Sequence, residues 1–117
     1  MKAYTDLEQS KKLAEFLPLE SADMCYIQDL LAGGKYGDYK PYIGNLIPAY
    51  GQDKIRCWSL AALLGVLPYL SLHKTFSGWR CDSYNKEGTS CILGVPADNP
   101  VDACYEMILK LHKLKML

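Results

Sequence analysis

The sequence has little that would mark it for a specific chemistry, and each deficit excludes a class of protein. Its 13 Lys and Arg residues are balanced by 13 Asp and Glu residues, so it lacks the excess positive charge of typical nucleic-acid-binding proteins. The longest run without a formal charge, Cys57 to Leu72, contains Pro68 and is shorter than the ~20 apolar residues of a membrane span. We therefore expect neither a nucleic-acid partner nor a membrane partner.

Signals for secretion and for disulfides are equally scarce. The first residues enter a polar helical pattern without an apolar segment and a small-residue cleavage site. The five cysteines are odd in number and widely spaced, which favours reduced core thiols over a disulfide framework. They are Cys25, Cys57, Cys81, Cys91 and Cys104. The sequence predicts a cytoplasmic protein.

What is present indicates one folded domain over residues 1–117. Apolar residues make up 50% of the chain and charged residues 22%, close to the averages for globular proteins. A chain of this length buries roughly two thirds of its unfolded surface, which is enough for one core without metal or disulfides.

Three segments carry helix signals. Residues 5–8 match the capping box, with Thr5 as the predicted N-cap. Residues 58–67 are apolar on almost every side and predict a central, enclosed helix. Asn99 and Pro100 are an N-cap residue and a first-turn proline, and they begin the last predicted helix. Its apolar face consists of Val101, Cys104, Met107, Ile108, Leu111 and Leu114.

The segment before the central helix is less regular. Residues 24–27 form an apolar run that begins either a strand or a helix through Leu31, and we favour the strand. The density of glycine and proline in residues 33–53 predicts a long loop with one strand at residues 42–47.

Three short apolar runs follow the central helix, at residues 70–76, 79–84 and 89–95. The turn residues between them predict an antiparallel meander. Cys81 and Cys91 flank its last hairpin, and they share a sheet face with a three-residue loop but not with a four-residue loop. The expected fold is α+β in the order α-β-loop-α-β-β-β-α, with helices packed on one face of a small antiparallel sheet.

A search for catalytic and ligand motifs finds none. The glycines of residues 33–37 match neither the dinucleotide-binding nor the P-loop pattern, and they indicate a turn. His73 and His112 are far apart and no C-x-x-C is present, so no zinc site is expected. Ser59 lacks a nucleophile elbow and is interpreted as a helix cap or turn. Four acidic residues are interpreted as solvated loop charges: Asp23, Asp29, Asp38 and Asp53. We expect no catalytic residue, metal or cofactor.

Three stretches together resemble a group of short proteins encoded in the genomes and mobile elements of gut anaerobes. They are YTDLEQSKKLA from Tyr4, CWSLAALL from Cys57 and NPVDACYEMI from Asn99. The group has no assigned activity, so the resemblance implies a cytoplasmic accessory protein linked to phages or transposons and transfers no site residue.

The leading functional hypothesis is a non-enzymatic interaction protein, with a protein partner or a second copy of the chain as its target. The alternatives are a small enzyme whose site assembles from distant residues and a nucleic-acid accessory protein. Tyrosine favours recognition surfaces because it offers a large contact area with little rotamer entropy to lose. The candidate contact residues are therefore Tyr36, Tyr39, Tyr42 and Tyr50. The competing interpretation is that these rings roof the core under a loop.

Overall fold

The described part of the chain, residues 2–48 and 52–117 of a computed structural model, folds into three α-helices and two antiparallel sheets. The elements are α1 (Leu7–Ala14), the 3-10 turn η1 (Leu19–Ser21), β1 (Met24–Leu30), β2 (Tyr36–Ile43), β3 (Lys54–Cys57), α2 (Leu60–Val66), β4 (Leu70–Thr75), β5 (Gly78–Tyr84), β6 (Cys91–Ala97) and α3 (Pro100–Lys113). One sheet has the order β2-β1-β3 and the other β4-β5-β6. The predicted α+β class is confirmed, with a second sheet formed by the segment before α2.

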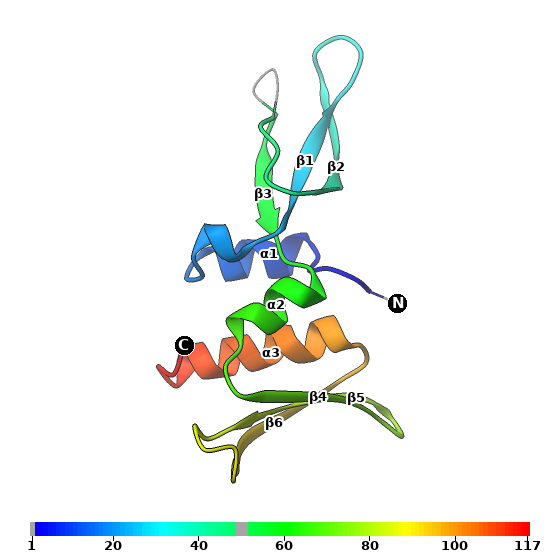
Figure 1. Cartoon of the computed structure of the whole chain (residues 1–117). Helices are drawn as coiled ribbons and strands as arrows, with labels where there is room; N and C mark the ends of the chain where they lie inside the picture. Colours follow the sequence, from blue (N-terminus) through cyan, green and yellow to red (C-terminus); the bar gives the residue numbers. More distant parts are fainter. Residues whose placement is uncertain (1, 49–51) are drawn as a thin grey trace.

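The two sheets lie at opposite ends of an elongated molecule (Figure 1). We call β2-β1-β3 the projecting sheet because it extends away from the helices. We call β4-β5-β6 the body sheet, and the body is this sheet with α1, α2 and α3. The radius of gyration is 16.1 Å and the principal extents are 58, 29 and 20 Å, whereas a compact chain of this length would have a radius of gyration near ~13 Å. The projecting sheet therefore holds its surface apart from the core.

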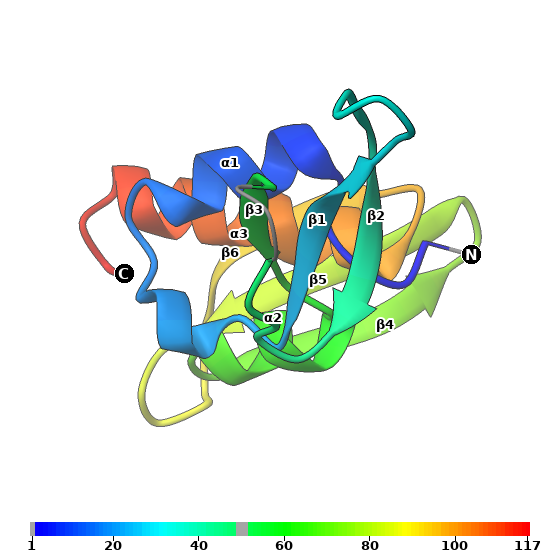
Figure 2. The ribbon, with the colours of Figure 1, turned by 90° about the horizontal axis from the view of Figure 1, so that it is seen from above.

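The main core lies in the body, where α3 packs on β5 and β6 and α2 packs on α3 (Figures 1 and 2). The predicted apolar face of α3 is buried at Val101, Cys104, Met107, Ile108 and Leu111. Leu114 is the exception. It follows the last helical residue as the C-cap and is 56% exposed.

The N-terminal boundaries of α2 and α3 follow from their caps. The Asn99 side chain accepts a hydrogen bond of 2.9 Å from the backbone N–H of Asp102, as the sequence predicted. Ser59 caps α2 by accepting from the N–H of Ala62 at 3.2 Å, so α2 begins at Leu60 rather than at Trp58.

The predicted N-cap of α1 is wrong by one residue. Asp6 is the N-cap, and its carboxylate accepts from the N–H of Gln9 while the Gln9 side chain accepts from the N–H of Asp6. Thr5 is fully buried, and its hydroxyl instead contacts Ser10 and accepts from the N–H of Trp58. The long-range partner Trp58 therefore takes the group that the local pattern assigned to the helix.

Residues 36–43 form strand β2, so the prediction of a loop is wrong for residues 36–41, and the strand predicted at residues 42–47 is present only at Tyr42 and Ile43. β2 pairs with β1 across the whole of Met24–Gln28. Gly44 donates to the carbonyl of Asp23 at 2.8 Å, which makes Tyr42 and Lys40 the residues whose backbone groups face β1. Pro41 lies between them, so its missing N–H falls on the outer side and removes no bond of the ladder.

The predicted meander is confirmed as β4, β5 and β6, and the prediction of a strand at residues 24–27 is confirmed as β1. Cys81 pairs with Val95 in the body sheet and is fully buried, whereas Cys91 pairs with Tyr84 and is exposed. The two cysteines therefore do not meet across the hairpin. The loop between β5 and β6 is residues 85–90, longer than either loop that was considered.

Candidate interaction surface

Seven exposed large apolar side chains lie on the projecting sheet or in the segments that adjoin its strands. We call this set the projecting surface: Leu30, Leu31, Tyr36, Tyr42, Ile43, Leu46 and Ile47. Ile43 and Ile47 are 85% and 92% exposed. Leu30, Leu31 and Tyr36 lie at the β1–β2 turn, and the other four lie at the end of β2 and in the segment that follows it.

The candidate tyrosines are only partly brought together. Tyr36 and Tyr42 are exposed, while Tyr39 is half-buried and donates a hydrogen bond of 2.5 Å to Asp53. This bond raises the pKa of Tyr39. Tyr39 and Tyr42 are three residues apart in one strand, so their side chains leave opposite faces of the sheet. Tyr50 lies outside the described residues.

The placement of Tyr36, Tyr39 and Tyr42 does not match a roof over the body core. That core is built from α1, α2, α3, β5 and β6 together with Trp58 and Ala22. The three tyrosines lie on β2, which is an edge strand of the projecting sheet. The strand that carries them belongs to the sheet that extends from the body (Figure 1).

The β1–β2 turn contains a sequence signal that the loop prediction overlooked. Gly33 and Gly34 have φ angles of 81° and 77°, and the N–H of Leu31 donates to the carbonyl of Lys35 at 2.7 Å. Adjacent glycines between two strand-forming runs are a hairpin signal because they adopt positive φ without strain. This signal would have located β2 and, with it, the exposed tip.

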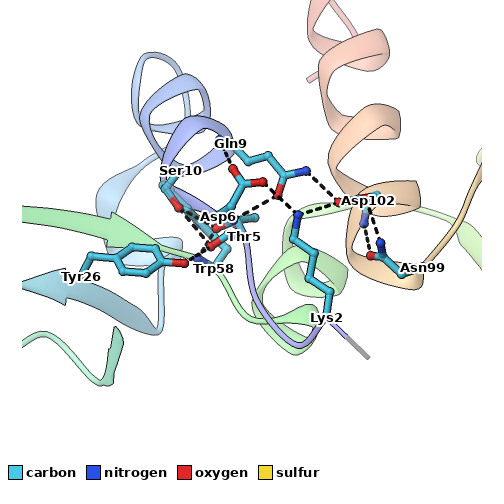
Figure 3. A network of polar contacts seen from close by, with 9 residues as sticks. All are labelled: Lys2, Thr5, Asp6, Gln9, Ser10, Tyr26, Trp58, Asn99 and Asp102. Carbon is cyan, nitrogen blue, oxygen red and sulfur yellow. Dashed lines mark hydrogen bonds and ion pairs between the residues drawn. The ribbon is translucent and has the colours of Figure 1, made fainter. Parts of the chain in front are cut away.

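A buried polar network joins the projecting sheet to the body (Figure 3). Thr5 donates from its N–H to the carbonyl of Trp58 at 2.9 Å, and the N–H of Trp58 donates to the Thr5 hydroxyl at 3.1 Å. The Tyr26 hydroxyl of β1 donates to the Thr5 carbonyl at 2.8 Å. Burial raises the pKa of Tyr26 to about 12. These bonds fix the start of the sheet to the segment before α1.

The same network continues to the N-terminus of α3. Asp102 accepts hydrogen bonds from Lys2 at 2.9 Å, from Gln9 at 2.8 Å and from the Asn99 side chain at 2.8 Å (Figure 3). Burial alone would raise the pKa of Asp102, but these three donors outweigh it and lower the pKa. The carboxylate thus links α1 and α3 and complements the helix dipole.

A second set of bonds fixes the same end of the sheet to the body. Asp23, just before β1, accepts from the N–H of Ser59 at 2.9 Å and also contacts the Ser59 hydroxyl. Arg56 of β3 donates to the carbonyl of Ala22 at 3.2 Å. Asp23 is exposed, as the sequence suggested, and it also has a structural role at the junction.

The only histidine beside a carboxylate in the described residues is His73, on the solvent-facing side of the body sheet. Its Nε2 lies 4.0 Å from Asp82, which also accepts from Arg80 at 2.7 Å. Gly94 leaves the room for this cluster, since a Cβ there would lie 2.1 Å from the Arg80 guanidinium. The His73 side chain is 45% exposed on an open sheet face, which gives a substrate no enclosure. His112 instead stacks on Phe16, with ring centroids 3.8 Å apart.

The cysteines are all free thiols. Cys25, Cys57, Cys81 and Cys104 are buried as expected, and the expectation is wrong for Cys91. Burial raises the pKa of Cys57 to about 12. The thiols of Cys81 and Cys104 interact by a hydrogen bond, which together with burial raises the pKa of Cys104. The same hydrogen bond lowers the pKa of Cys81. The raised pKa values make Cys57 and Cys104 weak nucleophiles, and all four buried cysteines pack as core residues.

Two of the remaining acidic residues pair with neighbours on the projecting sheet: Asp29 forms an ion pair of 3.3 Å with Lys40, and Asp53 accepts from Tyr39. Within residues 2–48 and 52–117, no three His, Cys, Asp or Glu side chains are grouped closely enough to bind a metal ion. None of the helices in this part of the chain has the length and apolar character needed to cross a bilayer. Comparisons with protein-family models, curated proteins and solved structures find no match to the chain.

Proposed function

We propose that the protein is a non-enzymatic interaction protein that binds a protein partner through the projecting surface. The observation that carries the proposal is that the projecting sheet and its adjoining segments hold seven of the fourteen exposed large apolar side chains of the described residues, in two groups at the two ends of β2. Single exposed apolar residues are common on folded proteins, but a group of them marks a binding site.

The junction with the body supports this role because it makes the sheet a rigid platform. Thr5, Tyr26 and Trp58 are buried and bonded to one another, and Asp23 is bonded to Ser59. A platform ordered before binding loses little conformational entropy when the partner arrives. The tyrosines add contact area at low entropic cost.

The charges around the projecting surface favour a protein partner over a nucleic acid. The sheet and its turns carry Lys35, Lys40, Lys54 and Arg56 together with Asp29, Asp38 and Asp53. Lys40 is paired with Asp29. A phosphate backbone would need unpaired cations over a longer stretch. Ile43 and Ile47 would instead fill apolar pockets on a protein.

The proposal also covers the cellular compartment of the protein and its genetic origin. The free cysteines support a reducing compartment, so we place the protein in the cytoplasm. The resemblance to short proteins of mobile elements supports an accessory role in such an element.

The test compares capture of partners from native cells by the wild-type protein and by the double variant Ile43→Ser and Ile47→Ser. Both side chains are almost fully exposed, so the variant should keep wild-type stability within ~0.5 kcal/mol. We expect the captured protein to bind the variant at least about tenfold more weakly, which is ~1.4 kcal/mol.

The matched control is Ile92→Ser, an exposed apolar residue on β6 of the body sheet. It should bind the partner as the wild type does. Equal binding by the wild-type protein and the double variant would show that the partner uses another surface.

A further inference from the structure

The two sheets of the described residues have four edges, and three of these carry a proline or two charged residues that oppose pairing with another strand. An edge strand presents unpaired N–H and C=O groups, and proteins protect such edges with proline and with charged side chains. On β2 the outward-facing residue at the middle of the strand is Pro41, as described above.

The edges of β6 and β3 are protected in the same ways. The backbone N–H of Tyr84 donates to the carbonyl of Tyr69 at 2.8 Å, so the backbone groups of every second residue of β5 point toward β4. The backbone groups of the residues between them, Trp79, Cys81 and Ser83, point toward β6. Their partners on β6 are Ala97, Val95 and Leu93. Pro96 lies between two of these partners, so its backbone faces outward. In β3, the bond from Gln28 to Asp53 leaves Lys54 and Arg56 as the outward residues.

The fourth edge, β4, is the least protected: it has no proline, and Lys74 is its one charged outward residue, beside Leu70 and Leu72. The alternation set by Tyr69 and Tyr84 leaves the N–H and C=O of Leu70, Leu72 and Lys74 facing away from β5. None of the three is proline, and each can both donate and accept. In Figure 2, β4 forms the outer edge of the body sheet on the side away from α1 and α3.

Exposed aromatic residues lie at both ends of this open edge. Tyr69, directly before β4, is 54% exposed, and Phe76, directly after it, is fully exposed. An antiparallel partner of the same sequence would place the start of one strand beside the end of the other. This brings Tyr69 of one copy and Phe76 of the other to the same end of the contact, at both ends.

We propose that β4 pairs antiparallel with β4 of a second copy of this chain, forming a continuous six-stranded sheet. Leu72 faces Leu72 of the second copy across the two-fold axis, and Leu70 faces Lys74 in both directions. All three outward residues of each copy then form hydrogen-bonded pairs, and each pair exchanges two bonds. The contact is isologous, as expected for a closed dimer.

This register also suits the side chains. The like charges of the two Lys74 residues lie at opposite ends of the contact, and the aliphatic part of each lysine covers Leu70. On the other face of the sheet, His73 lies opposite Ser71. Phe76 lies in the turn just beyond the paired residues, at the end of the contact where Tyr69 of the second copy precedes β4. A shift that placed Lys74 opposite Lys74 would bring like charges together, which is unfavourable.

The dimer goes beyond the proposed function and stands independently of it. Because the two-fold axis is perpendicular to the joined sheet, both projecting sheets extend from the same side. A partner with two matching sites would gain avidity from this arrangement.

The first test measures molar mass by sedimentation equilibrium from micromolar to millimolar concentration. Elution volume alone would mislead because the chain is elongated. We expect the mass of the wild-type protein to rise to twice the 13.1 kDa of one chain. Lys74→Pro removes one outward N–H, as Pro41 and Pro96 do on the other edges, and should remain at the monomer mass with unchanged circular dichroism. Lys74→Ser keeps the N–H and should dimerise like the wild type.

A crosslinking test reads the register and does not depend on the proline variant folding. In a Cys91→Ser background, Ser71→Cys with His73→Cys places thiols at a non-hydrogen-bonded pair, where Cα atoms are about 4.5 Å apart and disulfides form. Diamide should produce a covalent dimer from this variant and none from Thr75→Cys, whose two copies lie far apart. A wild-type protein that stays at the monomer mass, or a dimer that Lys74→Pro leaves intact without the crosslink, would overturn the proposal.

Discussion

The hydroxyl of Tyr26 and the backbone carbonyl of Thr5 form a hydrogen bond of 2.8 Å that connects the projecting sheet to the segment before α1. Tyr26 is 8% exposed and Thr5 is fully buried. The ring of Tyr26 also packs edge-on against Tyr4, with centroids 6.1 Å apart. This pair makes the sheet part of the cooperative fold instead of an independent arm.

Tyr26→Phe should destabilise the protein by about 1 kcal/mol at pH 8, because it removes the donor and keeps the ring. The pKa of Tyr26 is raised to about 12 in the folded state from an ordinary value of 10.0. The stability that this shift contributes is present below pH 10 and is lost as the pH rises toward 12. The difference between wild type and variant in urea melts should therefore shrink at pH 11. A difference that grows with pH would contradict this role of the neutral hydroxyl.

Tyr39→Ser combined with Tyr42→Ser should change the free energy of unfolding by no more than ~0.5 kcal/mol, as expected for residues of a contact surface. Both lie on the edge strand β2, outside the body core. The same variant should lose its partner. A loss of several kcal/mol in denaturant melts would instead identify the rings as a roof over buried residues.

Ile108→Ala should cost about 2 to 5 kcal/mol and Asn99→Ala about 1 kcal/mol. Ile108 is fully buried in the face of α3 that packs on the body sheet, so its truncation leaves a cavity. Asn99 caps the N–H of Asp102 and also donates to its carboxylate. Denaturant melts of the two variants give the order, and a milder effect of Ile108→Ala would refute the assigned core face.

Gly78→Ala should destabilise the protein by about 1 to 3 kcal/mol, since the backbone there adopts a conformation that side chains avoid. Gly78 has a φ of 151°, and an added Cβ would lie 2.6 Å from the carbonyl oxygen of Ala97. Gly65→Ala is the matched control. Its Cβ would meet nothing within 4 Å in α2, and it should stabilise by up to about 1 kcal/mol. Thermal melts that moved both variants in the same direction would contradict this account.

The elements that the sequence predicts well are those with local signals. Asn99 and Pro100 define the start of α3 through bonds to residues only three positions away. The body sheet follows from turns whose residues are contiguous. Such features depend on the chain within a few residues, so periodicity and capping rules reach them.

The features that sequence reasoning missed depend on distant partners. Pro41 is compatible with β2 only because β1 lies on the side where its missing N–H is not needed. Thr5 cannot cap α1 because Trp58, over fifty positions away, takes its hydroxyl. The exposure of Ile43 and Ile47 also cannot be read from their apolar character, since a buried strand would show the same residues. Only the tyrosines of the surface had a recognisable signal.

Met24 and Cys57, the first residue of β1 and the last of β3, are direct partners in the projecting sheet. Hydrogen-bonded partners of this kind have Cα atoms about 5.5 Å apart, so the chain leaves the body and returns to it at one place. Residues 24–57 are therefore an insertion in the topological sense, and the body chain is continuous without them. The same closure sets what a graft of this sheet would need: the ends of a recipient loop could stay close together, but the recipient would have to replace the Thr5 carbonyl that accepts the hydrogen bond of Tyr26 here.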